Sequence, residues 1–249
     1  MSTRVRFGAT ALQVSPVCFG TWQLSPRFWG PQPEAEVRGA MNCAFEHGIN
    51  FFDTADAYGD GLAETVLGKF IADVPRHDLV ICTKLVNHFN PDGSRYPDTS
   101  AAHLTERLEA SLRRLRTDHV DLLLLHFYDQ LTPFAEVTAA LDRLRDQGKV
   151  RHYGVSNYNT EQLRAIRHFG PYNAHQPPYS FLDLGIESDL LPYCQAHDLG
   201  VMVYSPLHKG LLSGKYTGDE SFTDFRKSHP DFTGARFKDL AARVKGLAP

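Results

Sequence analysis

Cysteine is scarce in this chain of 249 residues, which contains only Cys18, Cys43, Cys82 and Cys194. The four are scattered, and none forms a CxxC pair of the kind found in zinc sites and redox centres. Three of them lie in apolar runs, where a reduced and buried thiol is the ordinary expectation. The sequence therefore argues against a disulfide framework, and we expect no metal site.

Excess charge and long apolar runs are also missing. The formal net charge is only -3, and no basic stripe suited to a phosphate backbone is present. The one short basic cluster, at 113, 114 and 116, is interleaved with leucines and predicts a solvated helix face. The longest apolar stretch, Leu122 to Leu125, is far too short to span a bilayer, and no signal-peptide core begins the chain. We therefore expect a cytoplasmic protein that binds neither nucleic acid nor membrane.

What the chain does have is an alternation of strand-like and helix-like segments. With 42% hydrophobic residues it can bury one sizeable core, so we expect a single domain over residues 1–249. Helical periodicity marks 34–47, 100–115 and 134–147, and a small hairpin is expected around Ala9 and Thr10. Continuous apolar runs, typical of parallel strands buried on both faces, lie at 17–22, 49–53, 79–84, 119–126, 152–156, 174–178 and 201–206.

This alternation favours a (β/α) barrel, with a doubly wound open sheet as the second possibility. A doubly wound nucleotide-binding fold needs GxGxxG after its first strand, whereas VCFGTW is followed here by QLSPRFWGP. Barrel enzymes instead place their chemistry after the carboxyl ends of the strands. Polar residues fall at that point along the chain: Asp53, Lys84, His126, Ser156 with Asn157, Gln176, and Tyr204 with Ser205.

Four of the residues near strand ends suggest a proton-donating site. Taken alone, Asp53 is more often a turn or cap residue, and His126 is more often a satisfied core histidine. Together with Tyr58 and Lys84, however, they supply the groups that reduction of a carbonyl needs. The ammonium of Lys84, held by Asp53, is expected to lower the pKa of Tyr58, the proton donor, while His126 orients the substrate oxygen. Since none of these side chains can supply hydride, a nicotinamide cofactor is required.

Several motifs follow one another in an order that is far more specific than any one of them. They are GINFFDTADAYG with GDGLAETVLGK, LVICTK, DLLLLH, GVSNY and YSPLHKGLLSGKY. On these motifs the chain resembles the aldo-keto reductase superfamily over nearly its whole length. The resemblance implies a TIM-type (β/α)8 barrel without a Rossmann fold, closed at the bottom by an N-terminal hairpin. It also implies NADPH or NADP+ bound at the top, with NADH not excluded.

The resemblance also assigns roles to individual residues. Asp53, Tyr58, Lys84 and His126 match the catalytic tetrad, with Tyr58 as general acid and base. Ser156, Asn157 and Gln176 match residues that hold the nicotinamide carboxamide, and Tyr204 matches the aromatic on which the ring stacks. The remaining cofactor residues implied are Trp22, Asp53, Ser205, Pro206, Leu207, Gly210, Lys215 and Arg226.

One departure from the family pattern concerns the C-terminus. The sequence stops at KDLAARVKGLAP, within what resembles the helix after the seventh strand. We therefore expect about seven βα units, without the eighth strand or the segment that usually holds the 2'-phosphate of NADP.

The expected function is NADP-dependent reduction of small aldehydes, ketones or sugars, or oxidation of the alcohols, by a possible homo-oligomer. Two alternatives stay open. One is a nucleotide-binding regulatory subunit resembling potassium-channel β subunits, and the other is a degenerate member that binds no cofactor. Because the channel subunits differ at the position of His126, this histidine favours the enzyme.

Overall fold

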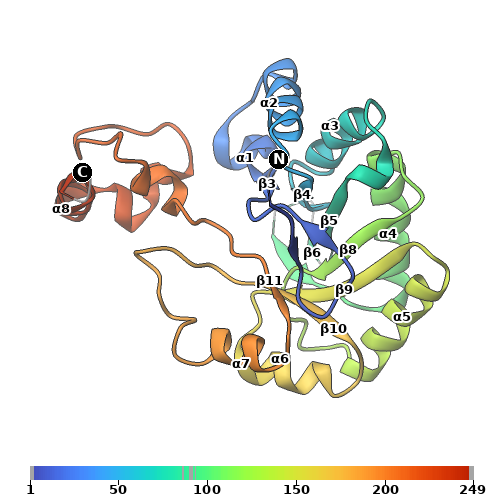
Figure 1. Cartoon of the computed structure of the whole chain (residues 1–249). Helices are drawn as coiled ribbons and strands as arrows, with labels where there is room; N and C mark the ends of the chain where they lie inside the picture. The colour runs from blue at the N-terminus through green and yellow to red at the C-terminus, as the bar shows by residue number, and fades with distance from the viewer. Residues whose placement is uncertain (1–2, 86, 90–91, 93, 247–249) are drawn as a thin grey trace.

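The computed structural model describes residues 3–85, 87–89, 92 and 94–246, and its main feature is a curled sheet of seven parallel strands (Figure 1). A TIM-type α/β fold with seven strands is thereby confirmed. The strands, in their order across the sheet, are β3 (Phe19–Gly20), β4 (Phe51–Asp53), β5 (Val80–Leu85), β8 (Val120–Leu125), β9 (Val150–Ser156), β10 (Tyr172–Gln176) and β11 (Gly200–Val201).

Helices cover the outer face of this sheet (Figure 1). The predicted helices at 34–47, 100–115 and 134–147 are confirmed to within a residue. In α4 the leucine stripe Leu104, Leu108, Leu112 and Leu115 is buried, and the Ser100 side chain caps the first turn by accepting from the amide of His103. The helices are α1 (Pro26–Trp29), α2 (Glu34–Glu46), α3 (Leu62–Ile71), α4 (Ala101–Leu115), α5 (Phe134–Asp146), α6 (Thr160–Arg167), α7 (Leu190–Ala196) and α8 (Gly234–Lys245).

The amino ends of the strands are closed by the predicted hairpin, which forms from β1 (Val5–Arg6) and β2 (Gln13–Val14). Phe7 from this hairpin packs edge-on against Phe51, with ring centroids 5.4 Å apart. Apolar side chains from the hairpin and from the inner face of the sheet share one buried cluster: Phe7, Leu12, Val14, Phe51, Val80, Cys82, Leu122, Leu124, Ala174 and Met202. The polar strand ends are therefore left at the opposite, open end.

The part of the chain after β11 differs from the prediction. A strand was expected over 201–206, but β11 covers only Gly200–Val201, and Tyr204 pairs with Pro178 through an isolated bridge. The chain continues through the 3-10 turns η3 (His208–Ser213), η4 (Phe225–Ser228) and η5 (Pro230–Phe232) to α8, which projects to one side (Figure 1). This segment has a small core of its own, formed by Leu211, Tyr216, Phe232, Phe237 and Ala241.

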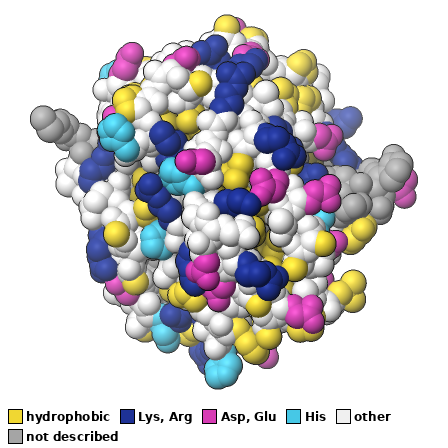
Figure 2. All heavy atoms as spheres, turned by 90° about the vertical axis from the view of Figure 1, so that its right-hand side faces the viewer, with side chains coloured by type: hydrophobic (Ala, Val, Ile, Leu, Met, Phe, Trp, Pro, Cys, Tyr) yellow, Lys and Arg dark blue, Asp and Glu magenta, His cyan; other side chains and the backbone are white. Residues whose placement is uncertain are grey.

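Three further short features were not predicted. They are a hairpin of β6 (Asn87–Phe89) and β7 (Arg95–Pro97), and the 3-10 turns η1 (Trp22–Leu24) and η2 (Arg76–Asp78). Figure 2 shows one face of the molecule, on which positive and negative side chains are interspersed. The prediction of a solvated helix face was wrong for Arg114, whose guanidinium pairs with the buried Glu64. None of the helices in the described residues is both long and apolar enough to cross a membrane.

Candidate active site

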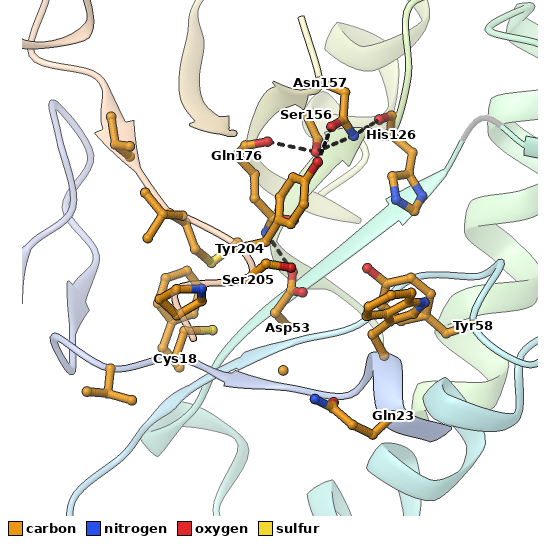
Figure 3. Close-up of a pocket in the computed structure, with 18 of the residues that line it drawn as sticks. Cys18, Gln23, Asp53, Tyr58, His126, Ser156, Asn157, Gln176, Tyr204 and Ser205 are labelled. Carbon is orange, nitrogen blue, oxygen red and sulfur yellow. Dashed lines mark hydrogen bonds between the residues drawn. The ribbon is translucent and has the colours of Figure 1, made fainter. Parts of the chain in front are cut away.

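A cavity of about 1700 Å³ extends from the carboxyl ends of the strands, along β3 and β11, to the N-terminal hairpin at Phe7 and Val14. Its upper part brings together residues that are far apart in the sequence (Figure 3). Every predicted site residue except Lys84 lines it. These are Trp22, Asp53, Tyr58, His126, Ser156, Asn157, Gln176, Tyr204, Ser205, Pro206, Leu207, Gly210, Lys215 and Arg226. Lys84 lies directly behind this wall and is fully buried.

Lys84 connects two of the cavity residues. Its Nζ donates to Asp53 Oδ2 at 2.7 Å, to the Thr54 carbonyl at 2.8 Å and to the Tyr58 hydroxyl at 3.2 Å. Burial by itself would lower the pKa of Lys84, but the carboxylate of Asp53 and the phenol of Tyr58 raise it above its ordinary value. Lys84 is therefore a charged ammonium whose three protons are all directed to oxygen atoms.

Tyr58 behaves differently from the prediction. Burial raises the pKa of its hydroxyl to about 12, outweighing the ammonium of Lys84, which lowers it, while the carboxylate of Asp53 adds to the increase. Lys84 lowers this pKa as expected, but the net shift is upward, because burial is the largest effect. Tyr58 is consequently a protonated phenol at neutral pH, which is the form that can donate a proton.

His126 lies across the cavity entrance from Tyr58. The two ring centroids are 5.8 Å apart and the rings meet edge to face. The His126 ring stacks on Phe127 at 4.7 Å, which fixes its plane. Because β8 ends at Leu125 and His126 donates its amide to the Leu85 carbonyl, the imidazole is held at the rim beside the end of β5. An oxygen atom between Tyr58 and His126 would face two potential donors.

A second polar group, formed at the ends of β9 and β10, lies on the other side of Asp53. Gln176 Nε2 donates to Asp53 Oδ1 at 3.0 Å, and Ser156 Oγ donates to the Gln176 carbonyl at 2.8 Å. Asn157 Nδ2 donates to the His126 carbonyl at 3.0 Å, and Asn157 has a positive φ of 59°. A left-handed conformation is costly for most residues, and Asn is among the few that adopt it readily. These amide and hydroxyl groups suit recognition of a carboxamide.

Tyr204 presents a flat surface to this group. Its hydroxyl donates to Asn157 Oδ1 at 2.8 Å, and the residue remains 37% exposed. Ser205 follows with a positive φ of 55°, which turns the chain sharply out of the strand. An exposed aromatic ring held at its far edge is suited to stacking against a planar ligand.

Cationic side chains line the far part of the same cavity. Lys209, Lys215 and Arg226 come from the segment after β11. Arg226 donates to Tyr216 at 2.6 Å and pairs with Asp224, and its guanidinium lies 5.1 Å from the Trp29 ring centroid. Burial lowers the pKa of Lys209. These groups match the charge of a phosphate-containing ligand.

An aromatic wall joins the β3 end of the cavity to that same segment. Trp22 contacts Phe28, Trp29 and Phe225, with centroid separations of 5.7, 5.3 and 5.3 Å. Phe225, which also contacts Phe28 and Trp29, helps to tie the C-terminal segment to the barrel. The wall gives the cavity an apolar side, next to the polar tetrad.

Sequence reasoning missed several residues around the site. Cys18 and Gln23 line the cavity (Figure 3), and burial holds the pKa of the Cys18 thiol well above its ordinary value, so it stays neutral. Asp56 and Glu64 are buried carboxylates behind the tetrad. Asp56 lies within the motif DTADAYG, so its position between Asp53 and Tyr58 was the one available signal.

The Aldo/keto reductase family matches residues 16–247. An aldo-keto reductase, YhdN, of Bacillus subtilis is 33% identical over 240 residues, covering 96% of this chain and 72% of the relative. An NADH-specific methylglyoxal reductase of Escherichia coli is 33% identical over 230 residues, covering 87% and 71%. The structure of a glycerol dehydrogenase from Gluconobacter oxydans superposes with a TM-score of 0.88 at 33% identity, covering 98% of this chain and 76% of that one.

Proposed function

We propose that this chain, which belongs to the aldo/keto reductase family and shares its carbonyl oxidoreductase chemistry, reduces a small aldehyde or ketone with Tyr58 as the proton donor. The observation that carries the proposal is the buried chain of contacts from Asp53 through Lys84 Nζ to the Tyr58 hydroxyl, at 2.7 and 3.2 Å. A fully buried lysine is rare unless it is paired.

In the proposed reaction each group of the tetrad has one task. The Tyr58 hydroxyl donates its proton to the substrate oxygen as negative charge develops there, and Lys84 stabilises the phenolate that remains. Asp53 keeps Lys84 charged and fixed. His126, at the opposite side of the rim, donates a hydrogen bond that orients the same oxygen. The pKa of about 12 at Tyr58 favours the donor role, and hence reduction, at neutral pH.

A nicotinamide cofactor bound in the cavity supplies the hydride. Its carboxamide would be held by Ser156, Asn157 and Gln176, and its ring would lie on Tyr204, because these residues offer amide, hydroxyl and aromatic groups side by side. The turn from Ser205 to Gly210, with Lys215 and Arg226, would follow the phosphates. We propose NADPH as the physiological cofactor. Because one relative is NADH-specific, NADH is tested in parallel.

The proposed substrate is a small carbonyl compound. Two of the similar proteins are named for small substrates, methylglyoxal and glycerol. In this chain the aromatic wall around Trp22 stands beside Tyr58 in one cavity. That wall would cover the apolar part of the substrate while its oxygen faces Tyr58 and His126.

The testing experiment is a fluorescence titration of the folded chain with NADPH, and with NADH in parallel, followed by turnover of a panel of small aldehydes, ketones and sugars. Micromolar or tighter binding together with cofactor oxidation on adding a carbonyl is the expected result. Binding without turnover of any carbonyl would favour a regulatory nucleotide-binding subunit. A folded chain that binds neither nucleotide would contradict the proposal and favour a degenerate member.

A further inference from the structure

Asp56 is a carboxylate buried behind the tetrad in an unusual way. It is fully buried, and its Oδ2 accepts from Arg107 Nε of α4 at 2.7 Å. Its other oxygen, Oδ1, is buried with no hydrogen-bond partner among the described residues. A buried carboxylate normally has both oxygens satisfied, because an unpaired buried acceptor is costly.

The free-energy cost of burying the Asp56 carboxylate is reflected in its pKa. Burial raises the pKa of Asp56 from its ordinary 3.8 to about 6, and Glu64 adds to the increase, while Arg107 and Arg114 oppose it. The ion pair with Arg107 therefore does not compensate fully for burial. A group that lowers stability and yet occupies the core calls for a reason other than stability.

The location of Asp56 supplies such a reason. It lies three residues after Asp53 and two before Tyr58, in the loop that carries both. Backbone bonds tie one side of this loop to β5, from the Thr54 amide to the Cys82 carbonyl at 2.9 Å and from the Asp56 amide to the Lys84 carbonyl at 3.1 Å. The Asp56 side chain reaches Arg107 of α4. The loop is thus held at Asp56 both by the backbone of β5 and by a side chain of α4.

Helix α4 places two arginines on the face that contacts the buried carboxylates. Arg107 and Arg114 are seven residues apart and so lie on one helix face, and Arg114 Nε donates to the buried Glu64 at 2.7 Å. Glu64 in turn accepts from Thr83, the residue before Lys84, at 2.6 Å. Gly61 has a positive φ of 86°, which favours glycine, and a Cβ there would lie 2.5 Å from Arg114 Cδ and Nε and so would displace this side chain. The face of α4 toward the tetrad is therefore anchored at a second point.

We infer that Asp56, clamped by Arg107, is a positioning residue that fixes the loop between Asp53 and Tyr58 so that the Tyr58 hydroxyl stays within reach of Lys84. This inference rests on the proposed function, since it assigns a task to the same site. Asp56 does not touch the cavity and acts through the backbone of residues 54–58. Small displacements of a proton donor reduce turnover strongly, by up to about a hundredfold for 1 Å.

The test compares Asp56→Asn with a matched change at the other end of the barrel, Asp121→Asn. Asp121 is also fully buried and paired with arginines, but both of its oxygens are satisfied, by Arg76 at 2.7 Å and Arg151 at 2.9 Å. We expect Asp56→Asn to lower kcat about tenfold to a hundredfold, with KM and NADPH affinity nearly unchanged and the melting temperature at pH 7 not reduced. Asp121→Asn should do the reverse, keeping kcat and lowering the melting temperature by about 5 °C or more.

A double-mutant cycle identifies the clamp itself. If Asp56 acts through Arg107, Asp56→Asn combined with Arg107→Gln will be no slower than the slower single variant. If the fold-reductions in kcat of the two single variants multiply in the double variant, Asp56 does not act through Arg107. A folded Asp56→Asn variant with the wild-type kcat would overturn the inference outright.

Hydrogen exchange separates failure of the inference from failure of the proposed function. The amides of residues 54–58 should exchange faster in Asp56→Asn than in the wild type, whether or not any carbonyl is reduced. In Asp121→Asn their exchange rates should equal those of the wild type. If the wild type turns over no carbonyl while exchange still accelerates, the proposed function fails and the clamp on the loop stands. Unchanged exchange over 54–58 would reject the clamp.

Discussion

The two ends of the sheet bury charge in opposite ways. At the amino end, Asp121 accepts from Arg76 and Arg151 through separate oxygens, and from the Ile81 amide at 2.9 Å. At the carboxyl end, Asp56 keeps one oxygen unsatisfied among the described residues, and the half-buried Tyr58 lies beside an ammonium. The amino end is thus organised for stability, while the carboxyl end tolerates unfavourable burial at the place where the proposed reacting groups lie.

The apolar surroundings of the two ends differ in the same sense. At the amino ends of the strands, Phe7 and its neighbours on the hairpin fill the barrel interior. At the carboxyl ends, polar side chains and the exposed ring of Tyr204 line the cavity of about 1700 Å³, which also reaches the hairpin at Phe7. Changes at the carboxyl end should therefore reduce turnover or binding, and changes at the amino end should reduce the free energy of unfolding.

The largest expected effect is on turnover at the carboxyl end. Tyr58→Phe removes the proposed proton donor but leaves the ring, so kcat should fall by about 10²–10⁴ while NADPH binding stays nearly unchanged. Steady-state kinetics and a fluorescence titration measure the two quantities. Tyr193→Phe removes a hydroxyl from α7, where it accepts from Arg167, and serves as the control with unchanged kcat. A Tyr58→Phe enzyme that keeps more than a few per cent of kcat would rule out the assigned role.

The matching change at the amino end should affect stability alone. Phe7→Ala removes a 6% exposed ring from the inner cluster and leaves a cavity, which should cost about 3–5 kcal/mol in the free energy of unfolding. Val5→Ala, at a 43% exposed position of the same hairpin, should change stability by less than about 0.5 kcal/mol. Urea unfolding gives both values. If kcat per folded molecule also drops in Phe7→Ala, the two ends of the barrel are coupled. The assignment of stability to the amino end and turnover to the carboxyl end is then contradicted.

The next prediction concerns how Asp56 makes the free energy of unfolding depend on pH. Because the pKa of Asp56 is raised to about 6 in the folded chain, the folded state holds a proton that the unfolded state has released between about pH 4 and 6. Stability from this group is present below pH 3.8 and is lost as pH rises through 6, by about 3 kcal/mol in all and about 1 kcal/mol between pH 5 and 7. Asp56→Asn removes this loss.

The measurement is urea unfolding of wild type and Asp56→Asn at pH 5 and pH 7. Other carboxylates, including those with lowered pKa values such as Asp129 and Asp224, titrate alike in both proteins and cancel in the difference. The variant should gain on the wild type by about 1 kcal/mol from pH 5 to pH 7. A difference that stays constant with pH would mean that Asp56 is ionised normally in the folded state.

The sequence predicted those features of the fold and site that local patterns encode. The strand ends at Asp53, Lys84 and His126 were found because a polar residue ending an apolar run is visible within a few residues. Arg114 was misinterpreted because its partner Glu64 is 50 residues away, and helical periodicity does not reveal a carboxylate on another helix. The net upward shift of the Tyr58 pKa was not predicted, because sequence indicates a neighbouring charge but not the degree of burial.

The last of the four predictions concerns Tyr204, at the boundary between the barrel and the segment after β11. Its ring is proposed to support the nicotinamide, while its hydroxyl holds Asn157 through a 2.8 Å bond. Tyr204→Leu removes both and should weaken NADPH binding about tenfold, whereas Tyr204→Phe keeps the ring and should weaken it less. Fluorescence titrations of the two variants separate stacking from the hydrogen bond. Equal loss in both would assign the effect to Asn157, and wild-type affinity in Tyr204→Leu would remove Tyr204 from the cofactor site. Because Phe7 lines the far part of the same cavity, the same titration on Phe7→Ala tests whether NADPH binding depends on the packing of the hairpin.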